Sequence, residues 1–371
     1  MSTGDRALKQ EEALAPSTRS PLRAVLCLLV AAVVLLPPLP AHAATITARP
    51  VATGLDFPAA FAFAPDGRIF YVERTTGEVR ILDGSTDSLF FTVSGTRSLV
   101  GVALHPNYPS TPYVYVWGRR VLSGAKKDQL LRITDSGGTG TSMKVVFGTS
   151  GGVEHYGGDV DFGPDGKLYL MIGDEGNPAN SQNLSSPAGK ILRMNPGGGI
   201  PSSGNAFPNS RVWAYGLRNS IGITFDPANA RLWLVDNGPE CNDEVDRIVK
   251  GRNYGWGPSE TCLTPPAPPR NTNQDGPDPV LPRWWFATTI GPTGAAFCSS
   301  CGLGSGIDGR LLFGDVNLGQ IHAATLNATR TGVVSEAVVY THSAGVLSIE
   351  TGPDGSLYFS EPGGIFELVS S

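Results

Sequence analysis

The sequence FGPDGKLYLMIGD at 162–174 joins a tight turn to an apolar strand, and its pattern recurs along the chain. Close copies are FAPDGRIFYVE at 63–73 and TGPDGSLYFSE at 351–361, and looser copies are LHPNYPSTPYVYVW at 104–117 and FDPANARLWLVDN at 225–237. In the Pro-Asp-Gly step, proline fixes φ and glycine accepts a positive φ, which suits a tight turn. The branched and aromatic residues that follow are typical of a half-buried β-strand. The repeated phrase predicts a chain built from similar β units.

The spacing of these copies indicates how many units there are. Successive prolines of the phrase lie 41, 58, 63 and 126 residues apart, and the last interval is twice 63. One further unit fits that gap, formed by residues 291–294 and the segment GRLLFGDVNLGQIHAATL at 309–326. Six such units predict an all-β fold, a six-bladed β-propeller with four-stranded antiparallel blades. Because blades usually take about 40–50 residues, we expect inserted loops, and the sequence places them at 177–187, 197–210 and 256–282.

The composition supports one turn-rich domain and excludes one class of partner. The 371 residues include 47 glycines and 30 prolines, and no segment has the composition of an interdomain linker. Only 16% of the residues are charged and the formal net charge is −5, whereas a nucleic-acid-binding protein needs a basic surface. We expect a single propeller over residues 44–371 and no nucleic-acid partner.

Residues 1–43 have the three parts of a signal peptide. A polar stretch ending in Arg23 precedes the apolar run AVLCLLVAAVVLL at 24–36, and Ala41-His42-Ala43 offers small residues for cleavage. The run of 13 apolar residues is short for a membrane-spanning helix. We therefore expect a periplasmic or secreted protein without membrane contact after cleavage. A retained membrane anchor is the alternative.

Four cysteines lie beyond the predicted signal: Cys241, Cys262, Cys298 and Cys301. An even number of cysteines in an exported chain indicates disulfides. Three pairings are possible, and proximity in the sequence favours Cys241 with Cys262 and Cys298 with Cys301. The Cys-Ser-Ser-Cys spacing also occurs in redox and zinc sites, but neither a βαβ pattern nor a histidine pair lies nearby.

Two segments carry candidate catalytic and binding side chains. His155 lies in EHYGGD, beside glycines that let a ligand approach, and histidine is the usual general base near neutral pH. The strand that follows ends at Asp174, whose carboxylate would orient the imidazole; a histidine that caps a turn is the alternative. Arg218 and Asn219 precede another strand in YGLRNSIGITFDP at 215–227. Arginine suits the recognition of planar carboxylates, and a surface cap is the alternative there.

A third segment, VDNGPECNDEVDRIVKGRNYGWG at 235–257, has the oxygen donors that calcium needs. Gly238 and Pro239 free backbone carbonyls in this loop. The segment does not contain an EF-hand pattern, and a solvated acidic loop is the alternative. Its acidic residues are Asp236, Glu240, Asp243, Glu244 and Asp246.

Taken together, these segments resemble the soluble PQQ-dependent glucose/sorbosone (aldose sugar) dehydrogenase family. That family binds pyrroloquinoline quinone (PQQ) and calcium in a six-bladed propeller. The Gly-Pro-Asp-Gly strands extend the resemblance weakly over the rest of the chain after residue 43. The matching pieces follow one another over about a hundred residues: HYGG from 155, FGPDGKLYLMIGDEG from 162, GKILRMN from 189, GLRN from 216, NGP from 237, DE from 243 and KGRNYGW from 250.

The resemblance implies roles for the catalytic candidates. His155 would be the general base that takes the proton of the sugar hydroxyl, while hydride passes to the quinone. Asp174 would support His155. Arg218 and Asn219 would contact the quinone.

The resemblance also implies calcium ligands. The carbonyls of Gly238 and Pro239 would hold the calcium that polarises the cofactor. Asp243 and Glu244 match an acidic pair of the family motif, which suggests a structural calcium.

The chain departs from the family pattern where cations normally neutralise the cofactor's carboxylates. Asp159 replaces an arginine after the two glycines, Asn317 replaces a lysine in the fifth blade, and Gly345 and Leu347 replace two arginines in the sixth. Removing one partner of a buried ion pair costs about 3–5 kcal/mol, so PQQ binding should be weakened unless other cations substitute. The arginines considered as substitutes are Arg283, Arg310 and Arg330.

Two functions follow as hypotheses. The first is an exported, PQQ- and calcium-dependent oxidoreductase that oxidises an aldose or related sugar. The alternative is a non-catalytic propeller of the same descent that binds carbohydrate or protein. A calcium-dependent lactonase is a more distant hypothesis, since its central cluster of carboxylates and amides is not identifiable in the sequence.

Overall fold

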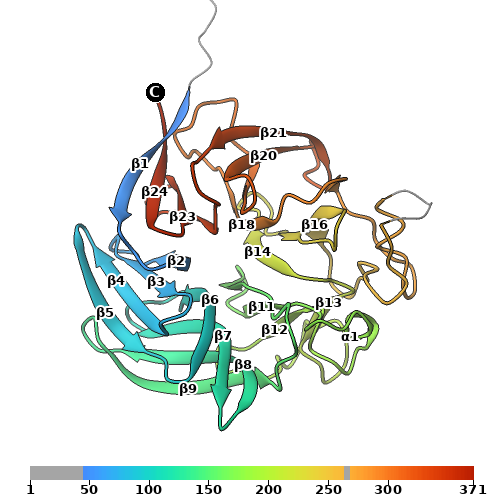
Figure 1. The fold of residues 1–371 in the computed structure, drawn as a ribbon, viewed down its shortest axis with the longest axis horizontal. Helices are drawn as coiled ribbons and strands as arrows, with labels where there is room; N and C mark the ends of the chain where they lie inside the picture. Colours follow the sequence, from blue (N-terminus) through green and yellow to red (C-terminus); the bar gives the residue numbers. More distant parts are fainter. Residues whose placement is uncertain (1–44, 263–267) are drawn as a thin grey trace, which may run out of the picture. The chain divides into compact units, whose positions relative to one another are not determined.

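The computed structural model describes residues 45–262 and 268–371, all within one compact unit, Ala44–Ser371. In these residues, 24 strands form six antiparallel sheets of four strands, arranged as a ring (Figure 1). The innermost strands line a cavity at each of their two ends, and the space that they surround is called the channel. The predicted six-bladed propeller is confirmed. Blade one is β2–β5, blades two to five follow in chain order, and blade six combines β22–β24 with β1. The predicted signal peptide, residues 1–43, lies outside the described residues.

Each blade runs from an inner strand at the channel to an outer strand at the rim. The inner strands are β2 (Pro58–Phe63), β6 (Thr96–Leu104), β10 (Val160–Phe162), β14 (Ser220–Phe225), β18 (Pro292–Phe297) and β22 (Ser348–Thr351). The second strands are β3 (Ile69–Glu73), β7 (Tyr113–Leu122), β11 (Leu168–Ile172), β15 (Leu232–Asp236), β19 (Leu311–Asp315) and β23 (Leu357–Glu361). The third strands are β4 (Glu78–Asp83), β8 (Ala125–Asp135), β12 (Lys190–Met194), β16 (Asp243–Ile248), β20 (Gln320–Leu326) and β24 (Gly364–Ser370). The outer strands are β5 (Thr86–Thr92), β9 (Gly140–Thr149), β13 (Val212–Tyr215), β17 (Trp284–Phe286), β21 (Val333–Thr341) and β1 (Ile46–Thr53).

Blade six closes the ring with strands from both ends of the described chain. β1 pairs antiparallel with β24, from Ile46 opposite Ser370 to Thr53 opposite Gly364, and the two strands lie side by side in Figure 1. The Ser371 N–H also donates to the Thr45 carbonyl at 3.0 Å. The ring is therefore held by backbone hydrogen bonds between segments that are far apart in the sequence.

The Pro-Asp-Gly phrase forms the turn between the inner and second strands of blades one, three and six. Its glycines have positive φ angles of 92°, 68° and 87° at Gly67, Gly166 and Gly355. In blade three, the Asp165 carboxylate accepts the Lys167 N–H at 3.1 Å, and the other two turns repeat this bond. The second strands β3, β11, β15 and β19 are buried at every residue, because each blade packs between two others.

Blade five replaces this turn with a longer loop that carries a disulfide. Cys298 is bonded to Cys301, and Cys241 is bonded to Cys262, so both predicted pairings are confirmed. Residues 292–294 of the predicted fifth unit lie in the inner strand β18 itself. The described residues contain one helix, α1 (Ala179–Gln182), in the predicted insertion at 177–187, and no helix there has the length and apolar character needed to cross a membrane.

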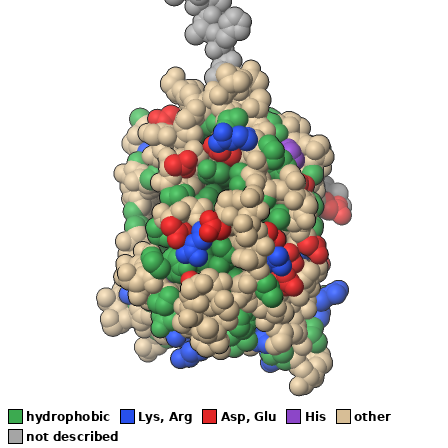
Figure 2. Space-filling model, turned by 90° about the vertical axis from the view of Figure 1, so that its left-hand side faces the viewer, with side chains coloured by type: hydrophobic (Ala, Val, Ile, Leu, Met, Phe, Trp, Pro, Cys, Tyr) green, Lys and Arg blue, Asp and Glu red, His purple; other side chains and the backbone are tan. Residues whose placement is uncertain are grey.

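The rim carries charges of both signs close together. Figure 2 shows the side of the ring where β1, β4 and β5 lie, and basic and acidic side chains alternate on it with apolar patches. Arg80 on β4 pairs with Glu78 and with Asp87 of β5, and Arg49 on β1 pairs with Glu367 of β24. These pairs leave no large field of a single sign on this side.

Three acids line the channel at the end where the inner strands finish. Asp159, Asp161 and Glu350 form part of the wall of a cavity of about 460 Å³ there. Burial raises the pKa of both aspartates to about 7, and the charge of Asp161 adds to the effect on Asp159. Burial is the main cause that raises the pKa of Glu350 well above its ordinary value, and the negative charges of the two aspartates raise it further. Asp159 thus joins a group of mutually repelling carboxylates.

This group predicts a pH-dependent stability. Below about pH 4 the carboxyls are protonated in both the folded and the unfolded chain. As pH rises above about 4, the unfolded chain releases protons that the folded channel retains, so the folded state loses stability until the pH exceeds the raised pKa values of the three groups. We expect Glu350→Gln to raise the free energy of unfolding by about 1–2 kcal/mol at pH 8 and to change little at pH 4. Urea unfolding at both pH values measures this, and an equal effect at both would contradict it.

Candidate active site

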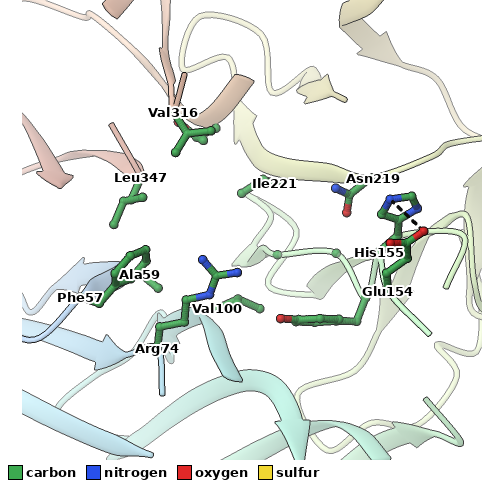
Figure 3. A pocket seen from close by; sticks show the side chains of 14 residues that line it. Phe57, Ala59, Arg74, Val100, Glu154, His155, Asn219, Ile221, Val316 and Leu347 are labelled. Carbon is green, nitrogen blue, oxygen red and sulfur yellow. Dashed lines mark ion pairs between the residues drawn. The ribbon is translucent and has the colours of Figure 1, made fainter. Parts of the chain in front are cut away.

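A cavity of about 370 Å³ opens at the other end of the channel, where the inner strands begin (Figure 3). All six blades contribute to its wall, so no single blade contains the site. The lining residues are Phe57, Ala59, Arg74, Val100, Glu154, His155, Tyr156, Gly157, Gly158, Asn219, Ile221, Thr293, Val316 and Leu347.

His155 and Asp174 form a hydrogen-bonded pair in this cavity. The His155 Nδ1 lies 2.8 Å from Asp174 Oδ1, and the two side chains are 17% and 2% exposed. Asp174 also accepts the Gly176 N–H at 2.8 Å and the Trp256 indole N–H at 2.9 Å. Burial alone would raise the pKa of Asp174, but the bonds from His155, Gly176 and Trp256 outweigh it and lower that pKa. An ionised Asp174 holds the proton of His155 on Nδ1 and leaves Nε2 as an acceptor.

The local backbone explains why glycines surround this pair. His155 has a positive φ of 49°, and its carbonyl accepts the Glu175 N–H at 3.2 Å. A Cβ on Gly173 would lie 2.2 Å from the same carbonyl and 2.8 Å from the Arg218 carbonyl. Only glycine therefore lets β11 approach the loops that carry His155 and Arg218.

Among the four described histidines, only His155 presents a ring to this cavity. His322 is buried with both ring nitrogens engaged, Nδ1 by Glu336 at 2.6 Å and Nε2 by Asp315 at 3.1 Å. His105 and His342 are absent from the cavity wall. The geometry leaves His155 as the histidine positioned to act as a base.

Asp236 fixes the backbone of the two predicted cofactor-binding residues. Its carboxylate accepts the Arg218 N–H at 2.9 Å and the Asn219 N–H at 2.7 Å. Asn219 reaches the cavity beside His155 (Figure 3). The Arg218 guanidinium lies 5.3 Å from the centre of the Trp256 ring and donates to the Asn237 carbonyl at 3.0 Å. Its buried Nε has no partner among the described residues, so it retains a free donor.

The insertion at 177–187, called the shelf below, contacts the segments that carry Arg218 and Trp256. Ser181 donates to the Leu217 carbonyl at 2.8 Å, and Gln182 donates to the Trp256 carbonyl at 2.7 Å. Lys190 fixes the shelf in place and is fully buried. Its ammonium group donates to the carbonyls of Asn180, Ser181 and Ala188 at 2.7, 3.0 and 2.7 Å. Burial lowers the pKa of Lys190 to about 7.

The predicted calcium loop divides into two parts. Asp243 accepts the backbone N–H groups of Gly238, Ile290 and Gly291 at 2.8, 2.6 and 2.8 Å, so its carboxylate already fixes the loop. Gly238 and Glu244 instead line a cavity of about 10 Å³. Arg218 and Trp256 also line it, and the rest of its wall is polar. No group of three His, Cys, Asp or Glu side chains converges as a metal site in residues 45–262 and 268–371.

The chemistry around Glu244 nevertheless fits a cation. Burial, and then the charges of Asp246 and Asp236, raise the pKa of Glu244 well above its ordinary value. Both Asp246 oxygens and Asn242 Oδ1 are buried and unpartnered among the described residues. An ion-sized cavity beside buried acids and amide oxygens meets the preference of calcium for oxygen ligands.

The positions opposite His155 are apolar. Val316 and Leu347 line the cavity on blades five and six (Figure 3), whereas Asn317 is exposed and outside its wall. None of the three arginines considered as substitutes lines it, and Arg330 is paired with Asp226 at 2.6 Å. A different arginine, Arg74 of blade one, points into the cavity. Among the described residues, the cavity wall therefore carries no cation on blades five and six.

Residues 55–366 match the glucose/sorbosone dehydrogenase family. The quinoprotein glucose dehydrogenase B of Acinetobacter calcoaceticus is 31% identical over 245 residues, covering 56% of this chain and 51% of that protein. The aldose sugar dehydrogenase YliI of Escherichia coli is 28% identical over 238 residues, covering 57% and 62%. The chain thus spans about half to two thirds of these two relatives.

A solved structure extends the likeness to most of the chain. The PQQ-bound form of the aldose sugar dehydrogenase from Streptomyces coelicolor superposes with a TM-score of 0.74 at 25% identity, covering 88% of this chain and 98% of that one. The chain belongs to the glucose/sorbosone dehydrogenase family.

Proposed function

We propose that the chain is an exported, PQQ- and calcium-dependent dehydrogenase that oxidises a hydroxyl of an aldose or related sugar. The observation that carries this proposal is the His155–Asp174 pair, 2.8 Å apart in the mouth cavity. The relatives named for glucose and aldose oxidation support the substrate class. Export rests on the signal-like sequence at 1–43.

In the proposed reaction the protein moves a proton and positions the substrate. His155 Nε2 accepts the proton of the hydroxyl, and Asp174 stabilises the resulting imidazolium through Nδ1. Asn219 lies beside His155 in the cavity wall and would form a hydrogen bond with the bound ligand. When bound, PQQ would supply the hydride acceptor that amino-acid side chains lack, and Arg218 with its free Nε would be one of the residues that hold it.

The same proposal assigns calcium to a position between the Gly238–Pro239 loop and Glu244. The carbonyls of Gly238 and Pro239 would supply neutral ligands, and Glu244 a charged one. Asp243 would act indirectly, since its oxygens already accept three backbone N–H groups.

Reconstitution tests the function directly. The purified protein, loaded with PQQ and calcium, is expected to reduce a redox dye in the presence of an aldose. A cofactor concentration of about 100 Kd should also raise the free energy of unfolding by about 2.7 kcal/mol, and removal of calcium with a chelator should reverse part of this gain. If neither dye reduction nor cofactor-dependent stabilisation occurs, the proposal is wrong.

The apolar wall at Val316 and Leu347 favours a second candidate, a propeller that binds carbohydrate without oxidising it. Without cations on blades five and six, the tricarboxylate cofactor would bind weakly, while the cavity would still accept a sugar. Sugar binding to the cofactor-free protein, with no turnover after reconstitution, would select this alternative.

A further inference from the structure

Arg74 is a fixed but unpaired cation at the edge of the mouth cavity. Its N–H donates to the Phe57 carbonyl at 3.1 Å and its carbonyl accepts the Leu99 N–H at 2.8 Å, so its backbone is held on both sides. The guanidinium lies 5.2 Å from the centre of the Phe57 ring. The side chain is exposed and forms no ion pair with any described residue. A stacked guanidinium with a free edge is suited to a planar, bidentate anion.

A second cavity continues outward from this arginine. It has a volume of about 620 Å³ and shares Phe57, Arg74, Glu154 and Tyr156 with the cavity that contains His155. A ligand whose hydroxyl contacts His155 can therefore extend past Arg74 toward blades one and two. The opposite direction is limited by the apolar side chains of Val316 and Leu347 (Figure 3).

The charges along this path favour an anion. The wall of the second cavity carries Arg74, Arg97 and Lys126, against Asp56 and Glu154. Its fourth cation, Arg119, is buried and neutralised by a two-bond pair with Asp128 at 2.6 and 2.7 Å. The balance is positive in a chain whose net charge is −5.

We propose that the substrate is a sugar that carries a carboxylate, of the uronic-acid class, and that Arg74 binds this carboxylate. This inference rests on the proposed function, because it places the reacting hydroxyl at His155. The carboxylate lies away from the reacting carbon, so Arg74 acts in specificity and not in the proton transfer. The edge of the guanidinium that Phe57 leaves free also matches a phosphate, so glucose 6-phosphate is the competing anion in the test.

The test compares acidic and neutral sugars of the same configuration. Dye reduction by the PQQ- and calcium-loaded protein is measured with galacturonate against galactose, and with glucuronate against glucose. We expect kcat/KM to be about tenfold higher for the uronates, a difference typical of one charge-assisted hydrogen bond. Arg74→Gln should reduce this uronate-to-aldose ratio by about tenfold, and Arg74→Lys by less, because lysine keeps the charge but loses the bidentate fork.

Arg132→Gln is the matched control. Arg132 also stacks on an aromatic ring, 4.2 Å from the centre of Tyr113, but it is absent from the walls of both cavities. Its loss should leave the uronate-to-aldose ratio unchanged. Raising the salt from about 20 to about 500 mM should increase the KM for uronates more than for aldoses, because screening weakens an exposed charge pair.

The outcomes separate this inference from the proposed function. If the protein oxidises aldoses but Arg74→Gln does not change the uronate-to-aldose ratio of kcat/KM, the inference is wrong and the dehydrogenase function stands. The inference also fails if Arg74→Gln lowers only the affinity for PQQ in a fluorescence titration, or if glucose 6-phosphate is preferred to the uronates. If no sugar is oxidised but galacturonate binds the cofactor-free protein in an Arg74-dependent way, by saturation-transfer NMR, the ligand class stands and the dehydrogenase function fails.

Discussion

Replacing His155 with alanine is expected to lower kcat by about 10²–10⁴-fold, the usual contribution of a general base. The geometry gives the reason, because Asp174, itself bonded to Trp256 and Gly176, holds Nδ1. Nε2 lies 3.9 Å from the Glu154 carboxylate, and both residues line the mouth cavity. Steady-state dye reduction with the reconstituted protein measures the loss. Calcium-dependent stabilisation should persist in the variant, since the Gly238 loop does not contact His155 through any described hydrogen bond.

His342→Ala is the control for this substitution. His342 is partly buried, bonds to Tyr340 at 3.0 Å and is absent from the cavity wall. Its removal should leave kcat within about twofold of the parent, as expected for a residue that does not touch the reacting groups. Turnover retained by His155→Ala would show that the base lies elsewhere, and the proposed mechanism would have to be abandoned.

Lys190→Met is expected to reduce the free energy of unfolding by about 3 kcal/mol. The ammonium group satisfies two carbonyls of the shelf and that of Ala188 next to it. Each buried acceptor left without a donor costs about 1–3 kcal/mol. Part of this cost is recovered, because removal of Lys190 also removes a buried charge whose pKa is lowered to about 7. Methionine fills most of the volume, so cavity formation contributes little.

Urea unfolding measures this loss, with Lys144→Met as the control on the exposed face of β9. The control should change the free energy of unfolding by less than about 0.5 kcal/mol. An equal effect in both variants would show that the three hydrogen bonds of Lys190 do not support the shelf. Because the shelf contacts Leu217 and Trp256, Lys190→Met should also weaken PQQ binding. The loss of affinity should be larger than the smaller fraction of folded protein accounts for.

The sequence predicted those features that are encoded locally. Each Pro-Asp-Gly turn is stabilised by its own residues: the aspartate accepts a backbone N–H within the turn, and the glycine adopts a positive φ. A short sequence is therefore enough to identify a blade. The pairing of His155 with Asp174 was also accessible, because the two residues flank the β10–β11 hairpin of blade three. Both disulfides join cysteines that are close in the sequence, separated by 21 and 3 residues.

Residues that meet only in the closed ring could not be predicted in this way. Trp256 bonds Asp174 from 82 residues away, and a tryptophan in an insertion has no periodicity that would reveal such a contact. Arg74 reaches the cavity from blade one, and its lack of a partner is visible only once the surrounding loops are assembled. Lys190 lies in the GKILRMN motif, but its role depends on three carbonyls of a loop whose path the sequence did not indicate.

The pairing of β1 with β24 has a consequence for how the protein is made. A chain that emerges from the ribosome or a translocase amino end first presents β1 before its partner exists, since β24 follows all the other strands of the described ring. Until then, β1 is an unsatisfied edge and the ring is an open arc, a form prone to pairing with other chains. Closure of the ring therefore waits until β24 has been made, and the edge of β1 stays exposed to chaperones until then.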